Sequence, residues 1–475
     1  MMSPRTHQEP GTSARAWPTN SALALLGLML VGLCRQGVNE IHHFVIGFGL
    51  VAMYQALLYL VAVWVVLNRP VDRWTFVIIL VCAAACRLVC LFSPPFLSTD
   101  VFRYVWDGRV QAAGINPFRY IPTDPHLAFL RDADIYPHIN RRGYAHTVYP
   151  PGAQILFLLI TRISASMVWM KAAMVGLEAL TIWIIVKLLA AAGLRREQVL
   201  IYAWHPLLLW EVASSGHVDA AALPLIALAL LFYVRRKPAA TGVALAAATL
   251  VKLYPIVIFP VLYRRADWRR GDWKMPASLA GVIAAGYACY LSVGLHVLGF
   301  LPEYAKEEGL ESGSRYFLLT LARNSLHWEG IPTAAFYGFA AVLLLGLALW
   351  AWFANEAGGE AGARATIRYS FVIAAVLMLL FSSHYPWYYL WLLPFLSVIP
   401  YTPMLYFTTA CFYLYTTQLA NPGPAMYYMF EWLYATVAML ALWCLGVRFL
   451  EARLSRGRPA PRKAFATYYP SARNS

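Results

Sequence analysis

The sequence predicts an all-α protein that crosses a membrane many times, and three observations lead to this prediction. Of the 475 residues, 60% are hydrophobic and only 13% are charged. A soluble domain is nearer half apolar, with about a quarter of its residues charged. The mean hydropathy is +0.56, and several apolar runs reach the roughly 18 residues that a spanning helix needs. We therefore expect a polytopic membrane protein.

About 12 apolar segments are the expected transmembrane helices, with boundaries defined to within a few residues. They cover residues 21–37, 44–67, 74–92, 167–191, 198–214, 218–234, 275–296, 332–353, 366–383, 387–400, 403–419 and 426–447. Another apolar segment, 239–262, contains Lys252, Pro255 and Pro260 and has basic clusters on both sides. Because basic loops stay in the cytoplasm, we expect this segment to be re-entrant, with a break at Pro255. Irregular backbone at membrane depth survives only where protein or a wet cavity covers it, so the break points to a buried site.

The net charge of +15 is explained by membrane topology better than by nucleic-acid binding, because the basic residues lie in short loops and in the C-terminal tail. This pattern predicts a cytoplasmic N-terminal tail over 1–20, a membrane domain over 21–450, and a basic, disordered cytoplasmic tail over 451–475. Two long outer loops are expected, over 93–166 and 297–330. Arg315 and Arg323 in the second loop are expected to be solvated.

A polar stretch begins the first outer loop and predicts an amphipathic helix from Asp100 to about Ala113. Its stripe of i, i+3, i+4 and i+7 positions holds Asp100, Arg103, Tyr104 and Asp107. Such a helix is typical of the membrane interface. Arg109 falls among the apolar positions, where we expect it to have an anionic partner.

The residue types on this helix suit glycosyl or phosphoryl transfer at a membrane surface. A carboxylate such as Asp100 or Asp107 can take a proton from an attacking hydroxyl, and guanidinium groups such as Arg103 and Arg109 can hold a phosphate. The aromatic residue Tyr104 could stack on a sugar. The alternative is that Asp100 only caps the helix, that Arg103 and Asp107 only pair, and that the stripe faces water.

Further candidate substrate-binding residues lie at the edges of other spans: Tyr149, His217, Asp219, Lys252, Tyr254, His384, Tyr385 and Trp387. His217 and Asp219 are two residues apart and could face one cavity, or they could form a plain polar turn. Lys252 could approach a lipid phosphate, neutralise Glu211 or extend to the membrane surface. His384 could bind a phosphate, whereas an aromatic belt also explains its neighbours Tyr385 and Trp387. His217 and Asp219 could also hold a metal, but two ligands are too few to predict a metal site.

Five segments in order resemble bacterial GT-C glycosyltransferases that use polyprenyl-phosphate sugars, notably glycosyltransferase family 87 (DUF2029) and the α-1,6-mannopyranosyltransferase-like proteins. They read STDVFRYVWDGRVQAAGINPF, TVYPPGAQILF, SSGHVDA, VKLYP and HYPWYYLWLLP. The resemblance covers roughly residues 70–450, and the first and third segments are fairly specific together.

The resemblance implies a GT-C fold and an inverting hexosyltransferase whose donor is a polyprenyl-phosphate sugar, with mannose expected. It implies a site on the outer face of a bacterial cytoplasmic membrane and an acceptor that is a glycan or a glycolipid. It also implies that Asp100, or second Asp107, is the general base, and that Arg103, Arg109, His217, Lys252 and His384 hold the leaving phosphate. No cofactor is required, and a divalent metal is left open, as is the oligomeric state.

Two other functions remain as alternatives. A transporter or flippase of lipid-linked sugars would also have intramembrane charges and a broken helix, but its polar groups would gather near the bilayer midplane. A non-catalytic scaffold would not need aspartates that converge with basic residues on one face.

Overall fold

The computed structural model describes residues 12–40, 47–354, 359–419 and 422–456. Within these residues every regular element is a helix, which confirms the all-α prediction for the described part of the chain. The longest helices are α1 (Thr12–Asn39), α2 (Gly49–Asn68), α3 (Arg73–Leu91), α6 (Met167–Ala191), α16 (Thr333–Ala354), α17 (Gly359–Phe381) and α21 (Pro422–Arg456).

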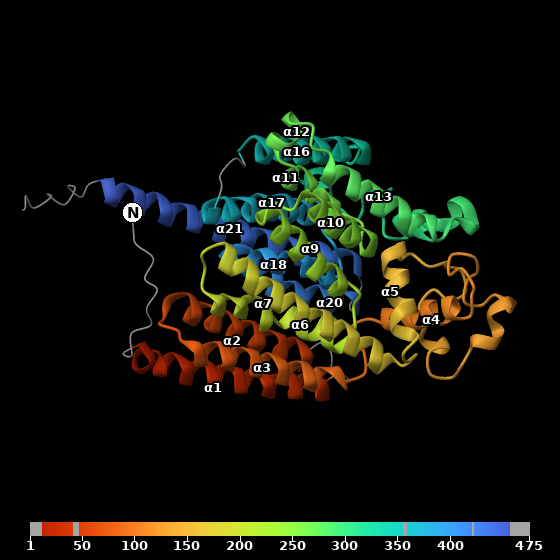
Figure 1. The fold of residues 1–475 in the computed structure, drawn as a ribbon, viewed down its shortest axis with the longest axis horizontal. Coiled ribbons are helices and arrows are strands. Elements are labelled where there is room, and N and C mark those ends of the chain that lie inside the picture. The colour runs from red at the N-terminus through yellow and green to blue at the C-terminus, as the bar shows by residue number, and fades with distance from the viewer. Residues whose placement is uncertain (1–11, 41–46, 355–358, 420–421, 457–475) are drawn as a thin grey trace, which may run out of the picture.

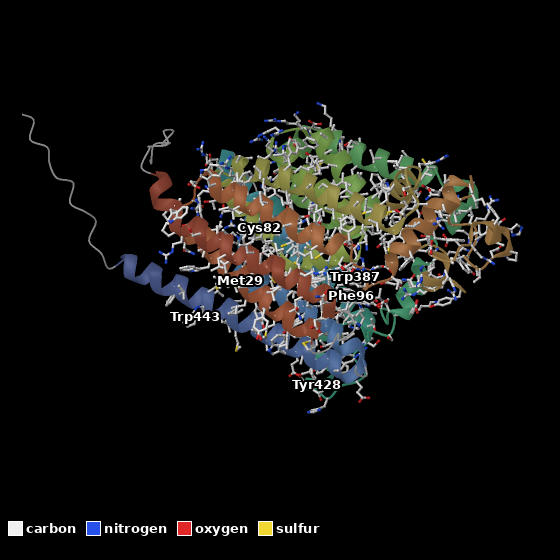
Figure 2. The ribbon with its side chains drawn as sticks, turned by 90° about the horizontal axis from the view of Figure 1, so that it is seen from below. Met29, Cys82, Phe96, Trp387, Tyr428 and Trp443 are labelled. Atoms are coloured by element: carbon white, nitrogen blue, oxygen red, sulfur yellow. The ribbon has the colours of Figure 1, made fainter. Side chains whose placement is uncertain are left out.

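These seven helices are long and apolar enough to cross a membrane, and each matches an expected span. The best agreement is at α6, whose bounds are those predicted for 167–191. Figure 1 shows α1, α2 and α3 side by side along one edge of the molecule. The outer surface of the long helices is apolar. Met29 of α1 and Trp443 of α21 lie at the exterior in Figure 2, and their side chains are 48% and 72% exposed. Exposed apolar side chains over several long helices indicate contact with lipid, so the chain is a membrane protein.

The other five expected spans consist of shorter or broken elements, so the predicted number of about 12 is not reached. The expected span 198–214 consists of η5 (Arg196–Val199), α7 (Leu200–Ala203), α8 (Pro206–Leu208) and η6 (Leu209–Ser214), and the span 218–234 is the single short helix α9 (Asp219–Val234). The span 275–296 consists of α13 (Lys274–Ala288) and η8 (Leu291–Leu298), and the span 387–400 of η9 (Pro386–Leu392) and α18 (Leu393–Leu396). The span 403–419 consists of α19 (Thr402–Ala410), η10 (Cys411–Tyr413) and α20 (Leu414–Leu419). The described chain has seven candidate spans, or eight if α13 and the helix that follows it at 110° form one broken span. Apolar content predicted burial correctly, because most of these pieces lie in the core, but it did not predict their length.

The segment 239–262 is broken into several helices. Helix α10 (Pro238–Val251) ends where Lys252 becomes extended, with φ −144° and ψ 138°. The chain continues through η7 (Tyr254–Ile258) and α11 (Phe259–Leu262) to α12 (Arg265–Arg269). The Arg264 guanidinium donates a hydrogen bond to the carbonyl of Tyr233, so the two ends of the segment lie together. The α-helix therefore breaks at Lys252, three residues before Pro255, where the sequence predicted the break.

The two long loops meet at one end of the helices. The first loop contains α4 (Asp100–Ala112), η3 (Pro125–Leu130), η4 (Tyr136–His138) and α5 (Pro151–Thr161), and the second contains α14 (Leu301–Glu307) and α15 (Phe317–Ser325). Figure 1 shows α4 and α5 together at this end. The backbone N–H of Phe300 donates to the carbonyl of Thr147 at 3.0 Å. Gly299 has φ +56°, and a Cβ there would lie 1.8 Å from that carbonyl oxygen, so the close approach requires glycine.

The chain ends add one difference from the predicted domain limits. Helix α1 already begins at Thr12, inside the expected tail 1–20. Helix α21 continues to Arg456, inside the expected disordered tail 451–475. Residues 1–11 and 457–475 lie outside the described residues.

Candidate functional site

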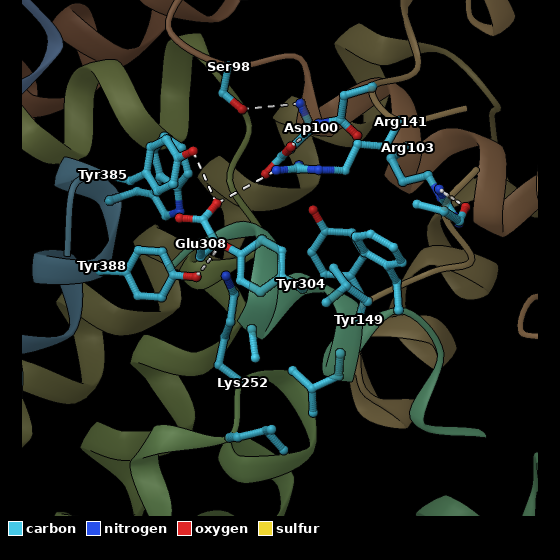
Figure 3. Close-up of a pocket in the computed structure, with 18 of the residues that line it drawn as sticks. Ser98, Asp100, Arg103, Arg141, Tyr149, Lys252, Tyr304, Glu308, Tyr385 and Tyr388 are labelled. Atoms are coloured by element: carbon cyan, nitrogen blue, oxygen red, sulfur yellow. Dashed lines mark hydrogen bonds and ion pairs between the residues drawn. The ribbon is translucent and has the colours of Figure 1, made fainter. Parts of the chain in front are cut away.

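A cavity of about 710 Å³ lies between the two long loops, the break after α10 and the segment between α17 and η9. Figure 3 shows its polar side chains turned toward a common space. Of the predicted site residues, seven line it: Asp100, Arg103, Tyr149, Lys252, Tyr254, Tyr385 and Trp387. The sequence therefore identified residues from four distant segments that the fold brings together.

Asp100 is the first residue of α4, as predicted, but it is not the cap. The N-cap is Thr99, and the Asp100 N–H donates to the Ser98 hydroxyl at 3.2 Å. The Asp100 carboxylate instead accepts a 2.6 Å hydrogen bond from the side-chain amide of Asn140 through Oδ1. Its Oδ2 makes no hydrogen bond to any part of the chain that the structure describes. One carboxylate oxygen is thus held in place while the other is available to a ligand.

Helix α4 has the predicted bounds, but its expected position at the interface is wrong. Almost every residue from Val101 to Val110 is buried, on the polar stripe as well as on the apolar side. The helix packs against α5 and α6, and the polar stripe is satisfied by protein groups. It is therefore an internal helix that presents its N-terminal residue to the cavity.

Asp107 lies under the cavity and does not line it. Its side chain is 2% exposed and accepts from Arg103 Nε at 2.7 Å, from the Thr147 hydroxyl at 2.6 Å and from Gln154 Nε2 at 2.9 Å. A carboxylate with three donors and no solvent is poorly placed to take a further proton. The geometry indicates that Asp107 holds Arg103 in position. Arg103 also donates a hydrogen bond to the carbonyl of Ala145 at 3.2 Å.

Arg109 has the anionic partner that the sequence predicted, Asp132, but it lies away from the cavity. It also donates to the carbonyl of Ala165 at 3.1 Å. Partial burial opposes ionisation of Asp132, yet hydrogen bonds from Arg109 and from two backbone N–H groups lower its pKa overall. Arg109 thus ties the loop together and does not face a donor phosphate in this geometry.

Lys252, Asp219 and Tyr254 form one cluster at the floor of the cavity. Lys252 Nζ is 3.1 Å from Asp219 Oδ2, and the Tyr254 hydroxyl donates to Asp219 Oδ1 at 2.6 Å. Asp219 is 1% exposed and does not line the cavity. Of the alternatives for Lys252, the one in which it neutralises Glu211 is wrong, since Lys252 pairs with Asp219.

His217 diverges from Asp219 and is fully buried. Its Nε2 is 3.3 Å from Glu211 Oε2, and the Tyr415 hydroxyl donates to Glu211 Oε1 at 2.7 Å. Glu211 sits in η6, which is a π-helix. His217 and Asp219 thus have different partners, Glu211 and Lys252, and neither of the two lines the cavity. His217 still touches the site indirectly, because its ring stacks on Trp387 with centroids 4.3 Å apart.

Two groups of packed aromatic residues reach the cavity. Tyr104 is buried beneath it and packs edge-on to Tyr149, with ring centroids 5.0 Å apart. Tyr385 stacks on Trp387 at 4.4 Å. These rings hold one another in fixed orientations, so the cavity presents preformed aromatic faces.

His384 does not line the cavity, although its neighbour Tyr385 does. Burial, with the nearby Arg315 charge, lowers the pKa of His384 to about 4. The ring is therefore neutral near pH 7. It is a weak candidate for a cationic phosphate ligand.

Four residues in the cavity were missed by sequence reasoning: Asn140, Arg141, Tyr304 and Glu308. Arg141 Nε donates to both oxygens of Glu307, at 3.0 and 2.9 Å, and its Nη2 is 3.6 Å from Glu308 Oε1. The Tyr385 hydroxyl also donates to Glu308, at 3.2 Å. These residues lie in long loops with no regular spacing, so only their clustered charges could have marked them.

The expectation that Arg315 is solvated is wrong. Its side chain is 1% exposed and pairs with Glu308. Its guanidinium also lies over the rings of Phe381 and Tyr385, 5.2 and 5.6 Å from their centroids. A buried arginine needs a partner of opposite charge, and Glu308, seven positions before Arg315, is that partner.

The cavity combines three kinds of surface. Arg103, Arg141 and Lys252 supply positive charge, each with a carboxylate behind it. Asp100 supplies a carboxylate with an available oxygen, and Tyr149, Tyr304 and Tyr388 supply aromatic faces. An apolar wall includes Leu253, Leu377 and Phe381. Such a site can hold a phosphate, a sugar and a hydrocarbon chain at once.

The N-terminal part of the chain matches a family model described as Alpha-(1->6)-mannopyranosyltransferase, N-terminal domain, over residues 20–265. The match covers more than half of the chain and includes α4, Asp219 and Lys252. Comparison with curated proteins and with solved structures found no match.

Proposed function

We propose that this chain, which belongs to the alpha-(1->6)-mannopyranosyltransferase family, transfers mannose from a polyprenyl-phosphate donor to a glycan or glycolipid acceptor. Membership of the family makes it a mannosyltransferase, a glycosyltransferase enzyme of the membrane. The donor, the acceptor, the outward orientation and the stereochemistry are the proposal. The observation that carries it is the presence of the Asp100 carboxylate in one cavity with Arg103, Arg141 and Lys252.

The cations hold the leaving phosphate. A polyprenyl phosphate departs readily once its charge is balanced, and arginine and lysine provide that balance through charge-assisted hydrogen bonds. Lys252 enters from the break after α10, while Arg141 and Arg103 enter from the first loop. Because the carboxylates behind them fix their positions, little reorganisation is needed when the donor binds.

The apolar wall accepts the first isoprene units of the donor. Leu253 follows Lys252 directly, and Leu377 and Phe381 come from the end of α17, a candidate span. A lipid chain that lies along this span would carry its phosphate to the level of Lys252. The hydrocarbon and the phosphate therefore have adjacent surfaces.

Asp100 takes the proton of the acceptor hydroxyl. The hydroxyl oxygen forms a bond to C1 of the mannose as the bond from C1 to the phosphate oxygen breaks, and polyprenyl phosphate leaves with the electron pair. A single displacement inverts the anomeric centre and needs one base on the face opposite the leaving group. The Asp100 oxygen without a protein partner suits this role.

The membrane orientation is part of the same proposal. The two long loops that cover the cavity lie on the outer face of a bacterial cytoplasmic membrane, and the basic clusters and both ends lie inside. The Arg264 guanidinium, just after the segment 239–262, contacts the carbonyl of Tyr233, just before it, and this contact supports an inward location for both ends of the segment.

The test is transfer of radiolabelled mannose from polyprenyl-phosphate-mannose by the purified chain, with Asp100→Asn compared against wild type. We expect Asp100→Asn to lower kcat by about 10²- to 10⁴-fold, the usual contribution of a general base, and to leave donor binding unchanged. Product analysis should show inversion at C1. Near-normal transfer by Asp100→Asn at equal expression would remove Asp100 from the base role.

Asp124→Asn is a matched control, because Asp124 lies in the same loop, contacts His126 and does not line the cavity. It should retain wild-type transfer. An assay in reconstituted vesicles distinguishes sugar transfer from the alternative function, which is transport of lipid-linked sugars across the bilayer. If wild type moves lipid-linked sugars across the bilayer and transfers no sugar from any polyprenyl-phosphate donor, the chain is a flippase and the proposal fails.

A further inference from the structure

A second cavity, of about 590 Å³, lies at the opposite end of α10 from the first. The first cavity is lined by Lys252, just after α10, and the second by Arg236, just before it. A 14-residue helix is about 21 Å long, so the two cavities are well separated. The second is built from the ends of α6 and α9 and the starts of α12 and α17. Since α6 and α17 are candidate spans, it lies where spans end, at the depth of lipid headgroups.

The second cavity is strongly basic. Arg236, Arg264, Arg265 and Arg269 line it, and Glu360 is the only acidic residue among its lining residues in the described chain. The excess of arginine is larger than in the first cavity, where every lining cation has a carboxylate in contact. A cavity lined by Arg236 and Arg269, whose guanidinium groups have no partner among the described residues, favours an anionic ligand.

Two of the arginines are free to bind such a ligand. The side chains of Arg236 and Arg269 make no hydrogen bond or ion pair with any residue in the described ranges. Arg264, in contrast, lies over the Tyr233 ring at 4.3 Å and donates to the Tyr233 carbonyl. Arg264 thus forms a fixed wall, and Arg236 and Arg269 supply the open donors.

The backbone at Arg236 is a second, independent observation. Its φ is +60°, the left-handed region that glycine adopts without strain. The N–H of Lys237 donates to the carbonyl of Phe232 at 2.9 Å and that of Arg236 to Tyr233 at 3.0 Å, which closes α9 in the way a glycine usually does. An arginine at a position that favours glycine puts a charge into the cavity at the expense of local strain, and such strain accumulates at functional positions.

We propose that this basic cavity, defined by Arg236, Arg264 and Arg269, is a phosphate-binding site separate from the catalytic cavity. Guanidinium groups recognise phosphate oxygens through paired hydrogen bonds. The phosphate belongs to an anionic phospholipid headgroup or is free in solution. This inference does not depend on the proposed transfer reaction.

The competing explanation is that these arginines only mark the cytoplasmic side of the membrane, with no defined site. A matched control separates the two. Arg69 follows α2 and Arg73 begins α3, and both are exposed. Arg195 contacts the Arg69 carbonyl and so links them to the same end of the helices, and neither lines a cavity in the described chain. The pair Arg69→Gln/Arg73→Gln removes the same charge as Arg236→Gln/Arg269→Gln.

The experiment measures two ligands on the purified full-length chain. Inorganic phosphate is titrated in detergent, with the thermal midpoint Tm as the readout. Phosphatidylglycerol and phosphatidylcholine are supplied in equal amounts, and native mass spectrometry counts the molecules retained. Arg236→Gln/Arg269→Gln should weaken binding of one ligand at least tenfold, and Arg69→Gln/Arg73→Gln should change it by less than twofold.

The two measurements together identify the source of the phosphate. Loss of the Tm response to inorganic phosphate, in the cavity variant alone, supports a site for free phosphate. Loss of phosphatidylglycerol retention alone supports a headgroup site. If both double variants weaken binding equally, or if neither does, the cavity is not a phosphate site. The unliganded Tm and mannosyl transfer show that each variant is folded.

Discussion

The side-chain amide of Asn140 donates a 2.6 Å hydrogen bond to Oδ1 of Asp100, across 40 residues of sequence. Asn140 follows η4 in the same loop, and both residues line the cavity. The amide restricts rotation of the carboxylate and leaves Oδ2 without a protein partner among the described residues. Asn140 therefore acts as a positioning residue for the proposed base.

Asn140→Ala should lower kcat for mannosyl transfer by about 10- to 100-fold and leave the donor KM unchanged. A hydrogen bond to a charged group contributes about 1.5–3 kcal/mol, and about 1.4 kcal/mol corresponds to a factor of ten. Asn140→Gln, which keeps the amide, should recover part of the rate. A fall in Tm with no specific loss of kcat would instead assign Asn140 a purely structural role.

Asp107→Ala should destabilise the protein strongly, because it leaves the Arg103 guanidinium buried without its ion-pair partner. Breaking a buried pair from one side costs about 3–5 kcal/mol, so Tm should fall clearly in a detergent melt followed by intrinsic fluorescence. Asp100→Asn is the control and should melt like wild type, since its carboxylate is partly exposed. An Asp107→Ala protein with normal Tm and no transfer would return Asp107 to the list of candidate bases.

Local patterns predicted local structure well. The 3.6-residue period at 100–113 and the flanking Ser98 and Gly114 predicted α4, and the apolar run 167–191 predicted α6. In both cases the signal lies within one helix. The stripe on α4 was nevertheless misjudged as a surface, because a helix buried in a polar network has the same period as one at an interface. Asp107 looks amphipathic in sequence and is covered by Thr147 and Gln154 in space.

Side-chain contacts that do not follow the period of one helix could not be predicted in the same way. Glu308 and Arg315 are both in a long polar loop, and nothing local distinguishes a buried ion pair from two solvated charges. His217 and Asp219 seemed a natural pair at two residues apart, but the π-helix before them separates their partners, Glu211 and Lys252. Short buried elements such as α18 were predicted as spans, because burial in protein and burial in lipid select the same apolar residues.

Lys252→Met should raise the donor KM by about 10- to 100-fold, since a charge-assisted hydrogen bond to the phosphate is lost. Lys252→Arg keeps the charge and should raise KM less. Asp219→Asn is the matched control for the structural part of the effect, because it breaks the 3.1 Å pair but retains the cation. If Lys252 serves only to neutralise Asp219, Lys252→Met will lower Tm and leave KM unchanged.

The stability of the protein should fall as the pH drops below about 6.5, in part through His146. Burial lowers the pKa of this histidine in the first long loop, and the positive charges of Arg103 and His296 act in the same direction. In the unfolded chain the ring takes up a proton near its ordinary value of 6.5, whereas the folded protein resists protonation until a lower pH. The unfolded state therefore binds more protons in this window, and the free energy of unfolding decreases as the pH falls.

His146→Gln should show a smaller drop in Tm between pH 7.5 and 5.5 than wild type, and His126→Gln, which alters an exposed ring in the same loop, should show the wild-type drop. Equal drops in wild type and His146→Gln would mean that other groups carry the acid sensitivity of this loop.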